Sequence, residues 1–113
     1  MEVSFGGYGE KTATFEATDG VTARMPVQVT QNGLVSPCEA GKNFCGVAVN
    51  VREGFAAIQL AGYVRLPYSG TAPAVGYQTL AGAGSGKIKS DAAGRSLLVV
   101  DVDTANALCG VIL

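Results

Sequence analysis

The C-terminal half of the chain holds the residues whose types and spacing could do chemistry. Gly82 to Lys87 has the composition of a phosphate-binding loop, in which glycine N–H groups cradle phosphate and a lysine contacts it. That motif also needs a glycine with four residues between it and the Gly-Lys pair, and a serine or threonine after the lysine to hold magnesium. Those two positions are Ala81 and Ile88. The spacing therefore predicts no nucleotide site here.

Two aspartates follow the apolar run Leu97-Leu98-Val99-Val100. Asp101 and Asp103, with Thr104, approximate the Asp-x-Asp-x-Thr loop of haloacid-dehalogenase-like phosphatases, but there the threonine lies one residue further on. Nine residues follow Thr104, too few for the fold that such a motif requires. The pattern instead indicates a strand on which aspartates that face solvent alternate with buried valines. A weak cation site between the carboxylates has no further support in the sequence.

Thiols and imidazoles offer no alternative chemistry. The chain has no histidine, which removes Ser/His and Cys/His nucleophiles and the commonest general base. Cys38, Cys45 and Cys109 lack metal-ligand spacing, and we interpret them as reduced thiols packed in the core; a Cys38–Cys45 disulfide in an oxidising setting is the alternative. We therefore expect no catalytic residues, no metal, no cofactor and no enzyme activity.

The composition of the chain limits the classes of partner that we expect it to bind. Eight basic and nine acidic residues are dispersed along the 113 residues, for a net charge of −1. Without a Lys/Arg cluster, neither nucleic acid nor an anionic membrane is an expected partner. No apolar run is long enough for a transmembrane helix, and the first residues lack a secretory leader, so we expect synthesis in the cytoplasm. Low charge and 16 glycines favour a surface covered by neighbours in an assembly.

The elements that must position these residues are strands. Apolar and polar residues alternate over Met25–Thr30, and Asn32-Gly33 is a strong hairpin signal. Helical periodicity is absent, so we predict an all-β fold, a small single-domain barrel or sandwich over residues 15–113, behind a flexible N-terminal arm over residues 1–14. The further expected strands are Phe44–Val51, Phe55–Leu60, Gly62–Leu66, Lys87–Lys89 and Ser96–Val102.

One short motif occurs twice. Phe44-Cys45-Gly46-Val47 recurs at the C-terminus as Leu108-Cys109-Gly110-Val111. Each copy is preceded at a distance by a proline-valine or proline-alanine segment and a glycine-containing turn. The motif is compatible with a duplication and equally with two strands that converged on similar residues.

Aromatic side chains provide the candidate contacts. Tyr63, Tyr68 and Tyr77 surround the loop Ser69–Pro73, and tyrosine is enriched at interfaces; these hydroxyls could equally point into water from strands. In the arm, Val3, Phe5 and Tyr8 are the residues that could add to the edge of a partner's sheet.

The order of segments resembles the head-decoration, or capsid-cement, proteins of tailed bacteriophages and prophages. The matching residues are Pro26-Val27, Asn32-Gly33, Gly46-Val47-Ala48, Gly62-Tyr63-Val64 and Pro73-Ala74-Val75-Gly76. The resemblance implies a β-rich, non-enzymatic virion protein that sits on the capsid surface in trimers or other small clusters and binds the major capsid protein, often through an N-terminal arm.

The expected function is therefore to decorate and stabilise a phage capsid as a homo-oligomer, with a trimer favoured. A phage tail or fibre component is the alternative within structural proteins. A small-ligand or glycan-binding β-module that uses the region of Tyr63, Tyr68 and Tyr77 is the alternative from another class.

Overall fold

The computed structural model describes residues 9–113 and places them in ten strands without a helix, which confirms the all-β prediction. Within that range, no helix is long and apolar enough to cross a membrane. The strands are β1 (Lys11–Ala17), β2 (Pro26–Gln31), β3 (Leu34–Pro37), β4 (Gly46–Arg52), β5 (Phe55–Ala61), β6 (Tyr63–Pro67), β7 (Gly76–Gly84), β8 (Lys87–Ser90), β9 (Arg95–Asp103) and β10 (Leu108–Ile112).

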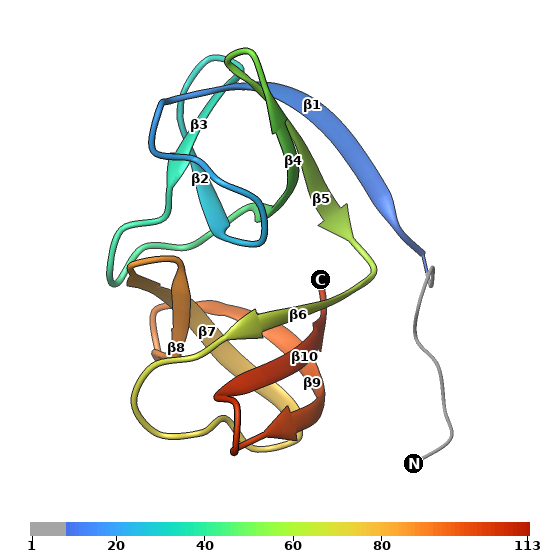
Figure 1. Ribbon diagram of the computed structural model, residues 1–113. Helices are drawn as coiled ribbons and strands as arrows, with labels where there is room; N and C mark the ends of the chain where they lie inside the picture. Colours follow the sequence, from blue (N-terminus) through green and yellow to red (C-terminus); the bar gives the residue numbers. More distant parts are fainter. Residues whose placement is uncertain (1–8) are drawn as a thin grey trace.

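The first half is a closed barrel in the order β1-β3-β2-β4-β5 (Figure 1). β1 pairs with β3 in parallel and with β5 in antiparallel fashion, so a single strand closes the sheet on itself. The predicted Asn-Gly hairpin joins β2 to β3, with Gly33 at a φ of 69°, a conformation that glycine adopts without a steric cost. Closure leaves this sheet without an unpaired edge.

The second half is a five-stranded sheet in the order β6-β10-β9-β7-β8, which lies below the barrel in Figure 1. Its two outer strands come together through a parallel bridge between Tyr68 and Ile88. The N–H of Ser69 donates to the carbonyl of Ile88 at 2.8 Å. The edges of this sheet are thus joined as well, although by a single bridge.

The two halves repeat one topology. If β1 to β5 are matched in chain order with β6 to β10, every pairing in the barrel has its counterpart: the parallel contact of β1 with β3 corresponds to the bridge that links β6 and β8. The N–H of Ala17 donates to Gly54 O, and that of Tyr68 donates to Ala107 O. Compared with β2 and β4, β7 and β9 pair in a register that is shifted by two residues. Because side chains alternate with a period of two, each still points to the same side of the sheet.

Register and bulges repeat as well. On β4 and β5, Asn50 lies opposite Ala57, and a bulge follows. On β9 and β10, Asp101 lies opposite Gly110, again beside a bulge. The register makes the following positions equivalent: Thr12 and Tyr63, Thr14 and Arg65, Ala17 and Tyr68, Asn50 and Asp101, Arg52 and Asp103, Phe55 and Leu108, Ala56 and Cys109, Ala57 and Gly110.

The Cys-Gly-Val motif does not mark this repeat. Gly46 begins β4 and Gly110 lies in β10, whereas the counterpart of β10 is β5. A Cβ on Gly46 would lie 2.4 Å from the carbonyl oxygen of Gln59, and one on Gly110 would lie 2.5 Å from the Tyr63 hydroxyl. The two glycines therefore serve close approach in different settings, and the similarity of the two motifs is not part of the structural repeat.

The halves share a core at their junction. Phe44 and Val47 from the first half pack in one cluster with the buried leucines and valines of the second sheet. The Arg95 guanidinium stacks 5.6 Å from the centre of the Phe44 ring and donates to the carbonyls of Phe44 and Cys45 at 3.3 and 3.2 Å. The segment before β4 is thus fixed to the start of β9.

The N-terminal boundary differs from the prediction. Residues 11–14 of the expected arm belong to β1 and pair with β5 along its length. The alternation of Thr12 and Thr14 with Ala13 and Phe15 is that of a strand with one face toward the core, although its polar residues are small. Residues 1–8 lie outside the described part of the chain.

Candidate functional site

The glycine-rich segment Gly82–Lys87 is a hairpin. Ser85 and Gly86 lie at φ values of 54° and 75° between β7 and β8, as a tight hairpin turn requires. The N–H of Gly82 donates to the carbonyl of Lys42 at 2.9 Å. A Cβ on Gly82 would lie 2.6 Å from the Cys38 sulfur, so this glycine permits the contact between the two halves.

Asp101, the first of the two aspartates of β9, binds two side chains of β6. The Tyr63 hydroxyl donates to Asp101 Oδ2 at 2.7 Å, and Arg65 forms an ion pair with Asp101 Oδ1 at 3.4 Å. Burial, followed by the hydrogen bond to Asp101, raises the pKa of Tyr63.

Asp103 organises the turn that follows β9. It accepts hydrogen bonds from the backbone N–H groups of Ala105 and Asn106 and, at 2.8 Å, from the Asn106 amide, and that amide bond is the main cause of its lowered pKa. The expectation that both aspartates face solvent is therefore wrong for Asp101, which is bonded to Tyr63 and Arg65. Among the described residues, no group of three or more Cys, Asp or Glu could hold a metal ion.

The three cysteines are free, and two of them are buried in the core as predicted. Cys38 and Cys109 are buried, Cys45 is partly buried, and none is in a disulfide. The Cys38 thiol donates to the carbonyl of Lys42 at 3.2 Å. Burial raises the pKa of all three and brings that of Cys109 to about 11, with the charge of Asp101 as a second cause. A raised pKa keeps a thiol protonated and unreactive at neutral pH.

Cys109 gives a prediction for alkaline pH. The unfolded thiol ionises near its ordinary pKa of 9.0, while the folded thiol holds its proton up to about pH 11. The unfolded chain therefore loses a proton first, and the free energy of unfolding falls as pH rises from 9 to 11. Urea unfolding across this range should show the fall, and Cys109→Ala should reduce its slope. Equal slopes in the two proteins would contradict the assignment to Cys109.

The candidate aromatic residues do not share one surface. Tyr68 is 7% exposed and packs in the core cluster that the halves share, because it lies two residues after the buried Leu66 and so faces the same side of the sheet. Tyr63 is bonded to Asp101, whereas Tyr77 on β7 is 75% exposed. The burial of Tyr68 corrects the interpretation of these tyrosines as one contact region and removes the main support for a glycan site there. Val3, Phe5 and Tyr8 lie outside the described residues.

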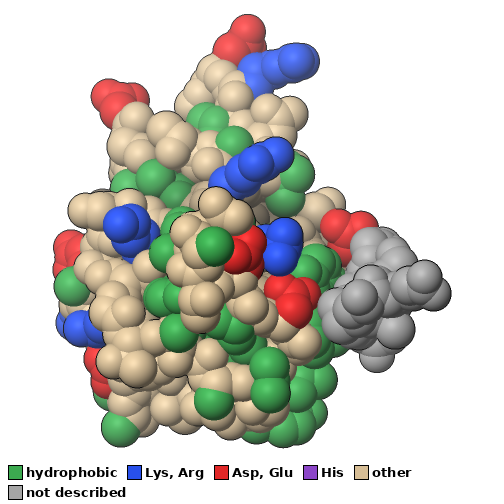
Figure 2. All heavy atoms as spheres, turned by 60° about the horizontal axis from the view of Figure 1, so that its bottom comes forward, with side chains coloured by type: hydrophobic (Ala, Val, Ile, Leu, Met, Phe, Trp, Pro, Cys, Tyr) green, Lys and Arg blue, Asp and Glu red, His purple; other side chains and the backbone are tan. Residues whose placement is uncertain are grey.

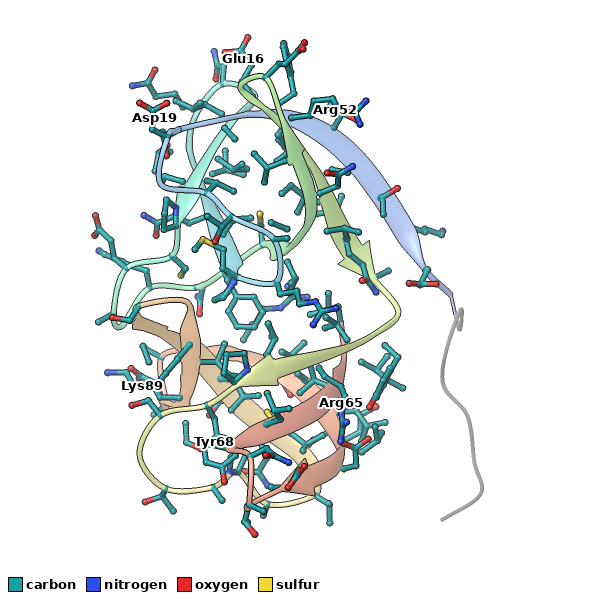
Figure 3. The ribbon with its side chains drawn as sticks, in the orientation of Figure 1. Glu16, Asp19, Arg52, Arg65, Tyr68 and Lys89 are labelled. Atoms are coloured by element: carbon teal, nitrogen blue, oxygen red, sulfur yellow. The ribbon has the colours of Figure 1, made fainter. Side chains whose placement is uncertain are left out.

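Figure 3 shows Arg65 and Tyr68 on the second sheet and Arg52 at the far end of the barrel. Arg65 is half exposed, while Leu66 beside it is buried, because neighbouring side chains on a strand point to opposite faces of the sheet. On the face seen in Figure 2, charged side chains are dispersed among hydrophobic and neutral ones. The large hydrophobic side chains that stay exposed in the described residues are Val29, Val49, Phe55, Leu60, Val75 and Tyr77.

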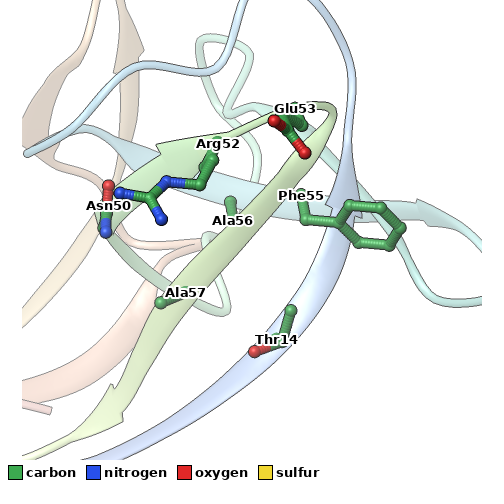
Figure 4. A pocket seen from close by; sticks show the side chains of 7 residues that line it. All are labelled: Thr14, Asn50, Arg52, Glu53, Phe55, Ala56 and Ala57. Carbon is green, nitrogen blue, oxygen red and sulfur yellow. The ribbon is translucent and has the colours of Figure 1, made fainter.

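A hollow of about 280 Å³ lies on the outside of the barrel (Figure 4). Its small side chains come from β1 and β5 and include Thr14 and Ala57, while Asn50 and Arg52 from β4 contribute polar groups. The Phe55 ring, 52% exposed, stands at its side. Its volume is just below the range of about 300–1,000 Å³ typical of small-molecule sites, and it suits a single large side chain.

Sequence reasoning missed this hollow. The residues that line it are unremarkable singly, and they come together only through the register of β1 with β5 and of β5 with β4. The available signal was the run of small residues at Ala56-Ala57, opposite Thr14 and Phe15.

The chain matches no known family model, and no curated protein matches it either.

Proposed function

We propose that this protein is a non-enzymatic virion component that binds and stabilises the surface of a tailed-phage capsid. One observation carries the proposal: each group that could have done chemistry is used for architecture. The glycine-rich segment turns a hairpin, Asp103 caps a turn, and Cys38 and Cys109 pack in the core. The all-β fold is the one that the resemblance implies.

The mechanism we propose is thermodynamic linkage between binding of this protein and assembly of the shell. A protein that binds the assembled lattice and not free capsid subunits shifts the equilibrium toward the closed shell by mass action. A body made of one closed barrel and one five-stranded sheet suits this role, because little conformational entropy is lost when a preformed surface binds. Low charge and exposed apolar side chains such as Val75 and Tyr77 are compatible with burial against protein neighbours.

Co-sedimentation tests the proposal. The full chain is mixed with shells assembled from the major capsid protein of the same phage genome and centrifuged through a sucrose cushion. We expect saturable binding and a higher temperature of shell disruption. Failure to co-sediment at micromolar concentrations would contradict the proposal.

The N-terminal arm gives a separate prediction. Deletion of residues 1–8, which include Val3, Phe5 and Tyr8, leaves β1 whole, because that strand begins at Lys11. If these residues add to the edge of a partner's sheet, the deletion should abolish binding to shells and leave the unfolding transition unchanged. Unchanged shell binding would refute a role for the arm, while the body could still bind.

A further inference from the structure

The strand register gives each half a row of side chains that crosses three neighbouring strands on its outside. In the first half this row consists of Pro26, Val47 and Gln59. The residues next to them, Ala48 and Ile58, belong to the core of the barrel, so Val47 and Gln59 point outward. The row is nevertheless buried, with Val47 1% and Gln59 5% exposed.

The second half covers this row. Val47 packs in the cluster that holds the buried leucines and valines of the second sheet. The Gln59 amide donates a hydrogen bond to the carbonyl of Tyr63, the first residue of β6, at 3.0 Å. The outer row of the first half is thus a face that binds folded protein.

The equivalent row of the second half lies at the surface. Tyr77 lies opposite Leu98 and Leu98 opposite Ile112, beside the same bulge as in the first half. Tyr77 is 75% exposed, and the row lines a depression of about 310 Å³. Val75, two residues from the tyrosine, is 66% exposed. Leaving such apolar side chains in water is unfavourable, and aromatic residues of this kind anchor protein interfaces.

The same depression is lined by a cation that has no counter-ion in residues 9–113. Nη1 of Arg95 donates to the carbonyls of Phe44 and Cys45. Its Nε and Nη2 have no partner in that range, and no buried side-chain nitrogen there lacks one, so both atoms reach solvent. Arg95 forms no ion pair with a described residue. A complementary partner therefore supplies a carboxylate as well as apolar side chains.

We propose that the row Tyr77, Leu98 and Ile112, together with Arg95, is the surface with which this protein binds the shell. The shell protein then places an acidic side chain, flanked by apolar ones, in the depression. A folded partner is favoured because a folded β-sheet half covers the equivalent row within the chain. This inference rests on the proposed function and adds to it the face of the body that makes the contact.

The apolar part is tested by co-sedimentation of the full chain with shells of the same phage. Tyr77→Ser removes the exposed ring from the row, and we expect it to weaken binding about tenfold or more. Val29→Ser is the matched control, because Val29 is also an exposed hydrophobic residue, 52% exposed, but lies on β2 of the barrel. It should bind as wild type does, and circular dichroism checks the fold of both variants.

The charged part is tested by a second pair of variants at Ser96, an exposed residue that lines the depression. Ser96→Asp adds a carboxylate beside Arg95 that repels the acidic group of the shell, so we expect binding to weaken about tenfold. Ser96→Asn introduces a side chain of the same shape without the charge and should bind nearly as wild type does.

The outcomes separate this inference from the proposed function. A wild type that does not co-sediment contradicts the proposed function itself. A wild type that binds while Tyr77→Ser binds equally well overturns the proposed surface and leaves the function standing. Equal binding by Ser96→Asp and Ser96→Asn overturns the predicted carboxylate and with it the proposal. If light scattering shows self-association of wild type that Tyr77→Ser abolishes, a second copy covers the row and the proposal is wrong.

Discussion

Replacing Phe44 by alanine should lower the free energy of unfolding by about 3–5 kcal/mol, the usual loss for a fully buried phenylalanine. Phe44 is 1% exposed and lies where the cores of the two halves meet. Its removal leaves a cavity at the junction and takes away the ring on which the Arg95 guanidinium stacks. Because the chain has no tryptophan, the loss is best measured by urea unfolding followed by circular dichroism.

Phe55→Ala is the matched control. Its ring is half exposed at the side of the hollow, so at concentrations where the protein is monomeric we expect a change within about 0.5 kcal/mol. A loss at Phe44 no greater than that at Phe55 would show that the junction does not hold the halves together. A transition that splits in two for Phe44→Ala would show that the halves then unfold separately.

The second large effect is expected at the glycine of the first Cys-Gly-Val motif. A Cβ at position 46 would lie 2.4 Å from the carbonyl oxygen of Gln59 and 2.8 Å from the Ile58 methyl carbon. Because backbone must move to relieve the first contact, Gly46→Ala should cost about 1–3 kcal/mol, the usual range for overpacking. Urea midpoints of variant and wild type measure the difference.

Gly110→Ala is its comparison. The added methyl group would meet the tip of Tyr63 and the carboxylate of Asp101, which are ends of side chains and can swing away. We therefore expect a smaller loss of stability, together with a lower pKa of Tyr63 as its hydrogen bond to Asp101 weakens. Equal losses at the two glycines would contradict the distinction between a backbone and a side-chain obstacle.

Much of the strand pattern could be predicted because local chemistry decides it. Asn32-Gly33 forms the predicted hairpin turn, and β6 ends at Pro67, a residue that cannot donate a hydrogen bond to a neighbouring strand. The predicted arm includes too many residues, because Lys11–Thr14 has the polar composition of an unfolded segment, whereas in the structure it pairs with β5. Tyr68 was expected at the surface because the predicted strand ends before Pro67, whereas the alternation that buries Leu66 continues to Tyr68, which is bridged to Ile88.

The repeat of β1 to β5 as β6 to β10 could not be predicted from the sequence for a different reason. Equivalent positions share geometry but not residue type: Ala56 corresponds to Cys109, and Asn50 to Asp101. The motif that does recur in the sequence lies on strands that are not equivalent. Backbone pairing and bulge positions are therefore a better record of the repeat than side chains.

The central claim, that the protein recognises an assembled shell, is tested most directly by comparing its binding to shells and to unassembled capsid subunits of the same phage. The labelled full chain is titrated with each at equal subunit concentration, and bound protein is measured by sedimentation for shells and by fluorescence anisotropy for subunits. We predict saturable binding to shells and at least a hundredfold weaker binding to free subunits, about 2.7 kcal/mol of preference for the lattice. Equal affinity for both, or no binding to shells, would contradict the account.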